Sequence, residues 1–230
     1  MAIAFVNSSV GTHDDTGASL ATAALSVTAG NAIIVIVHRW GGSGTPNGVI
    51  DTAGNTYAKC GSDMVNGDDC VSFYVAHNIT GHESNVVTAS WSSSVGYRRV
   101  LQLQYSGMHL TSAHDTGYAP GITSDSTSPL TTESANTAEN NELVVGCFVD
   151  QSDVNSTFSS SSPSNYRTSA GGDCGIADNA IASAGAGAVS LGTNQSHTYY
   201  CYAKAFKQAA AAGGGLSIPV AMAQYRQRWK

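Results

Sequence analysis

The sequence predicts an all-β fold, an antiparallel β-sandwich of jelly-roll type built from two similar halves. Asn31–Trp40 carries five consecutive branched aliphatic residues, Ile33 to Val37, after a glycine-containing turn. This pattern favours a strand buried on both faces over a helix. A second segment, Asn140–Val149, repeats the turn and the apolar run. The composition, rich in Gly, Ser, Thr, Asn and Ala, also indicates turns and strands.

The composition, the net charge and the lengths of the apolar runs argue against several classes of protein. Of the 230 residues, 42% are hydrophobic, a content typical of globular proteins. Only 11% are charged, which is low for a cytoplasmic enzyme. A net charge of −6 argues against general nucleic-acid binding. No apolar run is long enough to span a bilayer, and the first residues lack the basic and apolar regions of a secretory signal. We therefore expect no nucleic-acid partner, no membrane partner and no signal peptide.

The first half is expected to contain short strands joined by polar turns. Ala2–Val6 predicts a strand, Asn7–Gly17 a loop, and Leu20–Val27 a further strand. After the central strand and a Gly-rich loop, the predicted strands are Val49–Asp51 and Thr56–Cys60 around a hairpin turn, Val71–Ile79, Asn85–Trp91 and Arg98–Ser106. The last of these alternates Leu and Tyr with Gln102 and Gln104, which is typical of an antiparallel sheet with one polar face.

The second half follows a long polar tract, Gly107–Glu139, which is interpreted either as a crossover or as an extended loop with an edge strand near Leu130–Thr132. The strand pattern then restarts, with predicted strands at Leu143–Val149, Tyr166–Ser169, Cys174–Ala182, Ala188–Leu191 and Tyr199–Phe206. Matching features recur in the same order, which predicts an internal repeat of about residues 29–106 and 139–207. The alternative is chance similarity between two halves rich in Ala, Ser and Gly.

Each half alone is poor in aliphatic residues, so we expect one shared core. Residues 1–208 are predicted to form a single β-sandwich domain with double-Greek-key, jelly-roll-like topology. Residues 209–230 are predicted to be a spacer and a C-terminal interaction tail.

Four short motifs carry a resemblance to a known class of domain. They are Ala29–Asn31 with its aliphatic run, Asp51–Tyr57, Phe73–Ala76 and Gln104–Gly107. Together they resemble a widespread duplicated jelly-roll-like β-sandwich domain of uncharacterised bacterial and bacteriophage proteins, found near or within virion and cell-surface components. The resemblance spans roughly residues 20–208 and concerns the fold; it implies no catalytic residues. It implies attachment to a phage capsid or tail.

The cysteines number five, so at least one thiol has no partner within the chain. Cys60 and Cys70 flank a polar loop and are predicted to close it as a disulfide. Cys147 lies in mid-strand as a small buried hydrophobe; the pairing of Cys147, Cys174 and Cys201 stays open. A disulfide without an export signal indicates a protein released by cell lysis or a mature chain without its signal, hence a virion or extracellular location.

Known catalytic motifs are absent from the sequence, so no catalytic residue is predicted. His38 and His77 lie in predicted strands and are interpreted as core or sheet-edge histidines. A Ser/His/Asp triad requires a geometry that sequence spacing does not supply. We therefore expect that this protein is not an enzyme.

Two loops offer hard oxygen ligands for Ca²⁺, which is the one candidate cofactor. Asp63, Asp68 and Asp69, with Asn66, lie between Cys60 and Cys70, and the turn Asp51–Asn55 is a second candidate. Neither has the spacing of an EF-hand loop, and Asp and Asn are also ordinary turn residues.

Two aromatic sets suggest contact surfaces. Trp40, at a strand end beside a Gly-rich loop, and Trp91 are candidate glycan-stacking residues, with core packing as the alternative. The C-terminal residues proposed for partner binding are Tyr225, Arg226, Arg228, Trp229 and Lys230. The leading hypothesis is a non-enzymatic virion structural protein, a decoration or stabilising protein that associates with itself or with other virion proteins. The alternative is a carbohydrate-binding surface module of lectin type.

Overall fold

The computed structural model describes residues 2–42, 44–152 and 156–210, and this part of the chain is all β. The strands of the first half are β1 (Ala4–His13), β2 (Gly17–Ala21), β3 (Leu25–Val27), β4 (Ala32–Trp40), β5 (Pro46–Asp51), β6 (Ala58–Lys59), β7 (Met64–Asn66), β8 (Asp69–Ala76), β9 (His82–Asn85), β10 (Val87–Val95) and β11 (Arg98–Ser106). Those of the second half are β12 (Thr123–Asp125), β13 (Leu130–Thr131), β14 (Ala135–Thr137), β15 (Glu142–Asp150), β16 (Phe158–Ser160), β17 (Asn165–Ala170), β18 (Cys174–Ile181), β19 (Gly185–Gly187), β20 (Ser190–Thr193) and β21 (Tyr199–Phe206). No helix among the described residues is long and apolar enough to cross a membrane.

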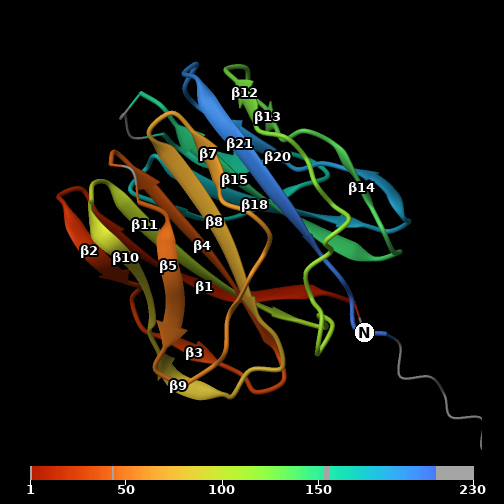
Figure 1. Ribbon diagram of the computed structural model, residues 1–230. Coiled ribbons are helices and arrows are strands. Elements are labelled where there is room, and N and C mark those ends of the chain that lie inside the picture. The colour runs from red at the N-terminus through yellow and green to blue at the C-terminus, as the bar shows by residue number, and fades with distance from the viewer. Residues whose placement is uncertain (1, 43, 153–155, 211–230) are drawn as a thin grey trace, which may run out of the picture.

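The strands form two large and two small antiparallel sheets. The first large sheet has the order β1-β11-β4-β8-β6, with β7 also paired to β8, and the first small sheet is β2-β10-β5. The second large sheet is β12-β21-β15-β18-β17, and the second small sheet is β13-β20-β16. Two short ladders, β3-β9 and β14-β19, complete the pairing. Figure 1 shows the first half, in red to yellow-green, beside the second half, in green to blue.

Three hydrophobic cores separate these sheets into layers. The central core contains Ile34 and Ile36 of β4 together with Val145 and Cys147 of β15, so the two large sheets face each other across it. The opposite faces of the large sheets pack against their own small sheets. One outer core contains Ile33 and Val35 with Ala89 of β10, and the other contains Val144 with Leu191 of β20. The antiparallel β-sandwich class predicted from sequence is therefore confirmed.

This layering explains the aliphatic run of β4. Every residue from Ala32 to Arg39 is buried, because one face of the strand lies on the central core and the other on an outer core. Alternate residues of a strand point to opposite faces, so a strand between two cores needs apolar residues at successive positions. Phe148 and Val149 of β15 show the same alternation in the second half.

The two halves have the same strand order. The path β1-β11-β4-β8-β6 corresponds to β12-β21-β15-β18-β17, and β2-β10-β5 corresponds to β13-β20-β16. The ladder β3-β9 likewise corresponds to β14-β19. All these pairings are antiparallel. Jelly-roll topology and an evolutionary duplication stay predictions.

Two local predictions are wrong. Residues Asn7 to His13, predicted as a loop, belong to β1, which pairs with β11 from Ala4↔Ser106 to His13↔Arg98. The turn at Thr52–Asn55 does not form a hairpin, because β5 joins the small sheet and β6 the large one. Gln102 and Gln104 lie together on the face of β11 opposite Leu101 and Leu103, and both are fully buried. The Gln102 carboxamide oxygen accepts hydrogen bonds from the Ser9 and Thr22 hydroxyls, at 3.3 and 3.4 Å.

Candidate functional site

One end of the central core collects polar groups from both halves, and we call it the Trp40 pocket. The pocket has a volume of about 40 Å³. Its lining residues are His38, Trp40, Asp69, Tyr97, Asp150, Gln151 and Asp173. They lie at the end of β4, the start of β8, the end of β15 and the start of β18, or in adjoining turns. The pairings His38↔Val71 and Trp40↔Asp69 place the first three side chains on the face of the sheet that meets the second half.

The floor of the Trp40 pocket carries polar atoms without hydrogen-bond partners. His38 Nε2 lies 2.8 Å from Asp69 Oδ1, and both side chains are only 1% exposed. In the described part of the chain, His38 Nδ1, Asp69 Oδ2 and Gln151 Nε2 have no partner. Buried polar atoms are normally satisfied by protein, water or ligand. If His38 Nε2 donates to Asp69, the unpartnered atoms are two acceptors, His38 Nδ1 and Asp69 Oδ2, and one amide donor, Gln151 Nε2, all buried in residues that line the pocket.

The two other acidic residues of the pocket are already satisfied. Asp150 Oδ1 accepts from the Ser152 amide at 2.8 Å, and its Oδ2 lies 2.5 Å from the Ser156 hydroxyl and 3.2 Å from His197 Nδ1. Asp173 accepts from Arg99 through both oxygens, Nε to Oδ1 at 2.8 Å and Nη2 to Oδ2 at 2.7 Å. Such two-point ion pairs fix orientation as well as adding energy. These carboxylates therefore hold the scaffold rather than face a ligand.

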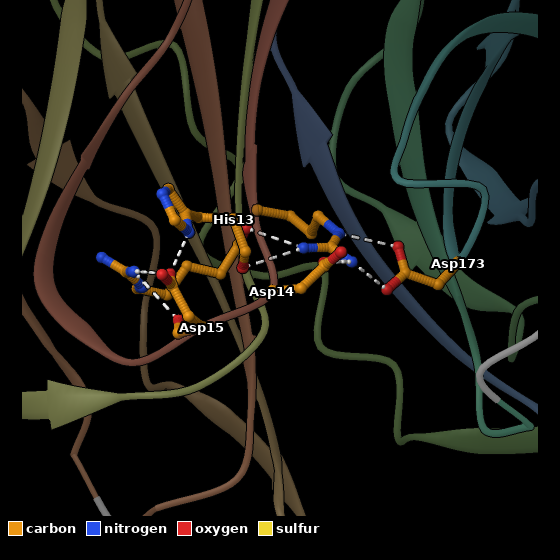
Figure 2. Close-up of polar contacts among 6 residues, drawn as sticks. His13, Asp14, Asp15 and Asp173 are labelled. Carbon is orange, nitrogen blue, oxygen red and sulfur yellow. Dashed lines mark hydrogen bonds and ion pairs between the residues drawn. The ribbon is translucent and has the colours of Figure 1, made fainter.

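Arg99 is the centre of a charged network that extends from the pocket to the β1–β2 turn (Figure 2). Its Nη2 also lies 2.7 Å from Asp14, and its Nη1 donates to the His13 carbonyl at 3.1 Å. Figure 2 shows His13, Asp14 and Asp15 on one side of this network and Asp173 on the other. The adjacent Arg98 donates to the Asp15 carbonyl at 3.0 Å, and His13 forms an ion pair with Asp15. His13, Asp14 and Asp15 thus hold Arg98 and Arg99 within the first half, and the Arg99–Asp173 pair makes the contact with the second half.

Trp40 is the exposed member of the pocket. Its side chain is 45% exposed, and its ring meets that of Tyr97 edge to face, with centroids 5.1 Å apart and an interplanar angle of 75°. Tyr97 has a φ of 41°, a left-handed conformation that is unfavourable for a residue with a Cβ. Backbone strain of this kind is often found where a side chain is held for a function. The pair forms an aromatic wall beside the polar floor.

Trp91, the second tryptophan predicted for glycan stacking, is in the interior. It is 4% exposed and belongs to the outer core of the first half. Residues of a core strand alternate between faces, and Trp91 lies on the inward face of β10 with Val87 and Ala89. The core alternative therefore describes Trp91, and of the two tryptophans predicted for glycan stacking only Trp40 is available to a ligand.

The structure does not bring the predicted calcium ligands together. Asp63 forms an ion pair with Lys59 at 2.5 Å and accepts from the Ser72 hydroxyl, whereas Asp69 contacts His38. Asp69 and Ser72 are three residues apart on β8, so they point to opposite faces of the sheet. The Asp68 carbonyl accepts from Arg39 Nη1 at 2.6 Å. Among the described residues, no three His, Cys, Asp or Glu side chains form a metal-binding group.

The predicted Cys60–Cys70 disulfide is absent, because both residues are free, buried thiols. Cys60 belongs to the central core with Val71 and Phe73, and its amide donates to the Phe73 carbonyl at 2.7 Å. Cys70 precedes Val71 and so points to the other face of β8. Cys147 is buried in the central core, as expected, with its Sγ 3.6 Å from that of Cys174. Cys201 is likewise a free thiol.

Sequence reasoning missed most of the pocket. It interpreted His38 as a core histidine and Asp69 as a calcium ligand, and it did not single out Asp150, Gln151 or Asp173. One signal was present: the dipeptide Asp-Cys stands at the start of β8, as Asp69-Cys70, and again at the start of β18, as Asp173-Cys174. A charged residue at the same place in both halves indicates the end where the large sheets meet.

Comparison with known proteins finds no matching family model, no matching curated protein and no matching solved structure. The resemblance to the duplicated jelly-roll-like domain stays a prediction. The proposed partner-binding residues Tyr225, Arg226, Arg228, Trp229 and Lys230 lie outside the described residues.

Proposed function

We propose that this chain is a non-enzymatic structural protein of a virion, a decoration or stabilising protein bound to a phage capsid or tail. The observation that supports a structural role best is the use of its buried charges. Arg99 and Asp173 join the two halves, and so do the Tyr105 hydroxyl and Asp178 Oδ2, at 2.8 Å. Arg167 pairs with Asp178 at 2.6 Å and lies over the Phe5 ring of the first half.

These contacts leave few groups for catalysis. An acid, base or nucleophile must be able to reach a substrate, and the carboxylates of the Trp40 pocket are hydrogen-bonded within the protein, apart from Asp69 Oδ2. The pocket volume of about 40 Å³ is also too small for a drug-sized substrate. Both facts favour a protein that works through its outer surface.

The virion proposal is tested by sizing and imaging the purified chain, alone and with phage particles, with and without Leu216–Lys230. We expect self-association or incorporation into particles, and loss of either on deletion of these residues while the β-sheet circular dichroism is unchanged. A strict monomer that is absent from particles in both forms would overturn the proposal.

The second candidate function is carbohydrate binding, favoured by Trp40 beside the unpartnered atoms of the pocket floor. A volume of 40 Å³ holds water molecules or hydroxyl groups rather than a sugar ring. A ring stacked on the exposed Trp40 would instead direct its hydroxyls toward Asp69 Oδ2, His38 Nδ1 and Gln151 Nε2. Aromatic stacking with a few placed polar groups is how small-ligand sites obtain specificity.

A glycan array followed by titration of the best ligand tests this second candidate. Trp40→Ala is expected to weaken binding by at least about tenfold, because loss of an aromatic anchor of hot-spot quality costs about 2 kcal/mol or more. Val65→Ala, which shortens a side chain that is 49% exposed, is the matched control and is expected to leave binding unchanged. Equal affinity of the parent and Trp40→Ala would refute the site.

A further inference from the structure

A second and larger hollow, which we call the Lys204 groove, lies between the halves and shares no lining residue with the Trp40 pocket. Its volume is about 400 Å³. Residues that line it include Lys59, Gly61 and Met64 from the β6–β7 region, and His114, Pro120 and Lys204 from the chain beyond β11. A hollow of this size lies within the range of small-molecule sites.

Lys204 lies on β21 and is directed at the first half. It pairs with Val145 and is on the same face of β21 as Tyr202 and Phe206, which belong to the central core. Its ammonium lies beside Gly61, where a Cβ would be 3.5 Å from Nζ. Gly61 has a φ of 78°, which favours glycine, so the turn brings bare backbone close to the ammonium.

Among the residues that the structure describes, the Lys204 ammonium has no acidic partner. The other two lysines of the described ranges are paired, Lys59 with Asp63 at 2.5 Å and Lys207 with Glu139 at 3.0 Å. Unlike these two lysines, Lys204 has no carboxylate of the described residues within 4.0 Å of its Nζ. Burial lowers the pKa of Lys204, and burial together with the Lys204 charge lowers the pKa of His114. A partly buried charge without a counter-ion is unfavourable and becomes favourable when an anion arrives.

The charges around the groove leave an excess of one positive charge. Asp63 also lines the groove, but Lys59 and the Ser72 hydroxyl hold its carboxylate. Lys204 is therefore the uncompensated charge, in a chain whose net charge is −6. Met64, Ala119 and Pro120 also line the groove and are apolar. The combination fits a ligand with one anionic group and a compact organic body.

We propose that the Lys204 groove binds a small organic anion of about monosaccharide size, whose carboxylate or phosphate pairs with the Lys204 ammonium. This proposal is independent of the virion role and of sugar binding at Trp40, since neither uses a residue of the groove.

Nuclear magnetic resonance titration of the full chain tests the proposal with three probes. Glucuronate carries a carboxylate, glucose 6-phosphate carries a phosphate, and glucose is the neutral control. We expect at least one anion, but not glucose, to shift the His114 ring resonances and the Lys204 amide. The tighter of the two anions identifies whether the groove prefers a carboxylate or a phosphate.

Variants at two lysines of the same strand region provide the matched comparison. Lys204→Gln is expected to weaken binding by at least about tenfold, as loss of a charge-assisted hydrogen bond does. Lys204→Arg is expected to keep most of the affinity. Lys207→Gln removes the same charge from a lysine already paired with Glu139 and is expected to have little effect.

Three results would overturn the proposal. They are no shift at His114 with either anion in the parent protein, equal shifts with glucose, or equal losses in Lys204→Gln and Lys207→Gln. The first two readouts use only the parent protein, so they hold even if Lys204→Gln fails to fold.

Discussion

Arg99 and Asp173 form a two-point ion pair between the halves of the molecule, with Nε to Oδ1 at 2.8 Å and Nη2 to Oδ2 at 2.7 Å. The Arg99 side chain is 3% exposed and that of Asp173 12%, so the pair is largely removed from water. The geometry fixes the start of β18 against β11, at the edge of the Trp40 pocket. A pair in this position ties the stability of the fold to the shape of the candidate site.

Arg99→Ala is expected to lower the free energy of unfolding by about 3 kcal/mol, because it leaves the Asp173 carboxylate buried without its counter-charge. Asp14→Asn is the control: Asp14 also contacts Arg99, but its side chain is 75% exposed, and an exposed pair contributes about 0–1 kcal/mol. Urea unfolding followed by circular dichroism measures both. Similar losses in the two variants would contradict a special role for the Arg99–Asp173 pair.

Gly171→Ala is expected to be more destabilising than Gly30→Ala. Both glycines have positive φ, 65° and 82°, so each substitution carries a backbone cost of about 1–2 kcal/mol. A Cβ at Gly171 would in addition collide with the Arg99 guanidinium, whereas a Cβ at Gly30 meets nothing within 4 Å. Thermal unfolding measures the decrease in Tm of each variant, and the difference between the two decreases reports the cost of the collision with Arg99. Equal decreases in Tm would show that Arg99 moves aside freely.

The sequence predicts best those strands whose pattern is local. The run Ile33–Val37 identifies β4 because both its faces are apolar, and the bounds predicted for Arg98–Ser106 and Tyr199–Phe206 are those of β11 and β21. The sequence pattern fails to predict the strand at residues 7–13, because their small polar side chains are typical of a loop. That segment is a strand because β11 supplies its hydrogen bonds from far away in the sequence.

The candidate site was harder to predict for the same reason. Arg99 and Asp173 are 74 positions apart, and Tyr105 and Asp178 are 73 apart. No local spacing connects them, and only the packing of one large sheet on the other brings them together. The repeated Asp-Cys dipeptide indicates the end where the two large sheets meet, but it does not indicate which residues contact Asp69 and Asp173. Exposure follows the same rule: nothing in the local sequence separates the exposed Trp40 from the buried Trp91.

The five cysteines are expected to remain thiols in the purified protein. All five are buried, and burial raises the pKa of Cys60 and of Cys201 to about 12. Because the thiolate is the reactive form, alkylation of the native protein at pH 8 is expected to be slow, and alkylation in guanidinium chloride to modify all five. Intact-mass spectrometry counts the modified residues. A native protein with a Cys60–Cys70 bridge would alkylate at three sites after unfolding without reductant.

Glu142 is a buried carboxyl at the start of β15. Its side chain is buried, one oxygen accepts from the Glu139 amide at 2.9 Å, and the other has no partner among the described residues. Burial, and then the negative charge of Asp115, raises the pKa of Glu142 to about 7. Its ordinary value is 4.5.

The sign of the pH dependence follows from proton linkage. Between pH 4.5 and about 7 the folded protein keeps the Glu142 proton while the unfolded chain loses it. The stabilising contribution of this carboxyl is therefore complete below pH 4.5, falls as the pH rises, and is gone above about 7. Glu142→Gln, which cannot ionise, is expected to remove this fall, so that the variant gains stability relative to the parent as the pH rises through this window. Glu83→Gln, at an exposed position, is expected to follow the parent at every pH. Urea unfolding at several pH values measures the three proteins, and a Glu142→Gln curve parallel to that of the parent would contradict the assignment of this proton to Glu142.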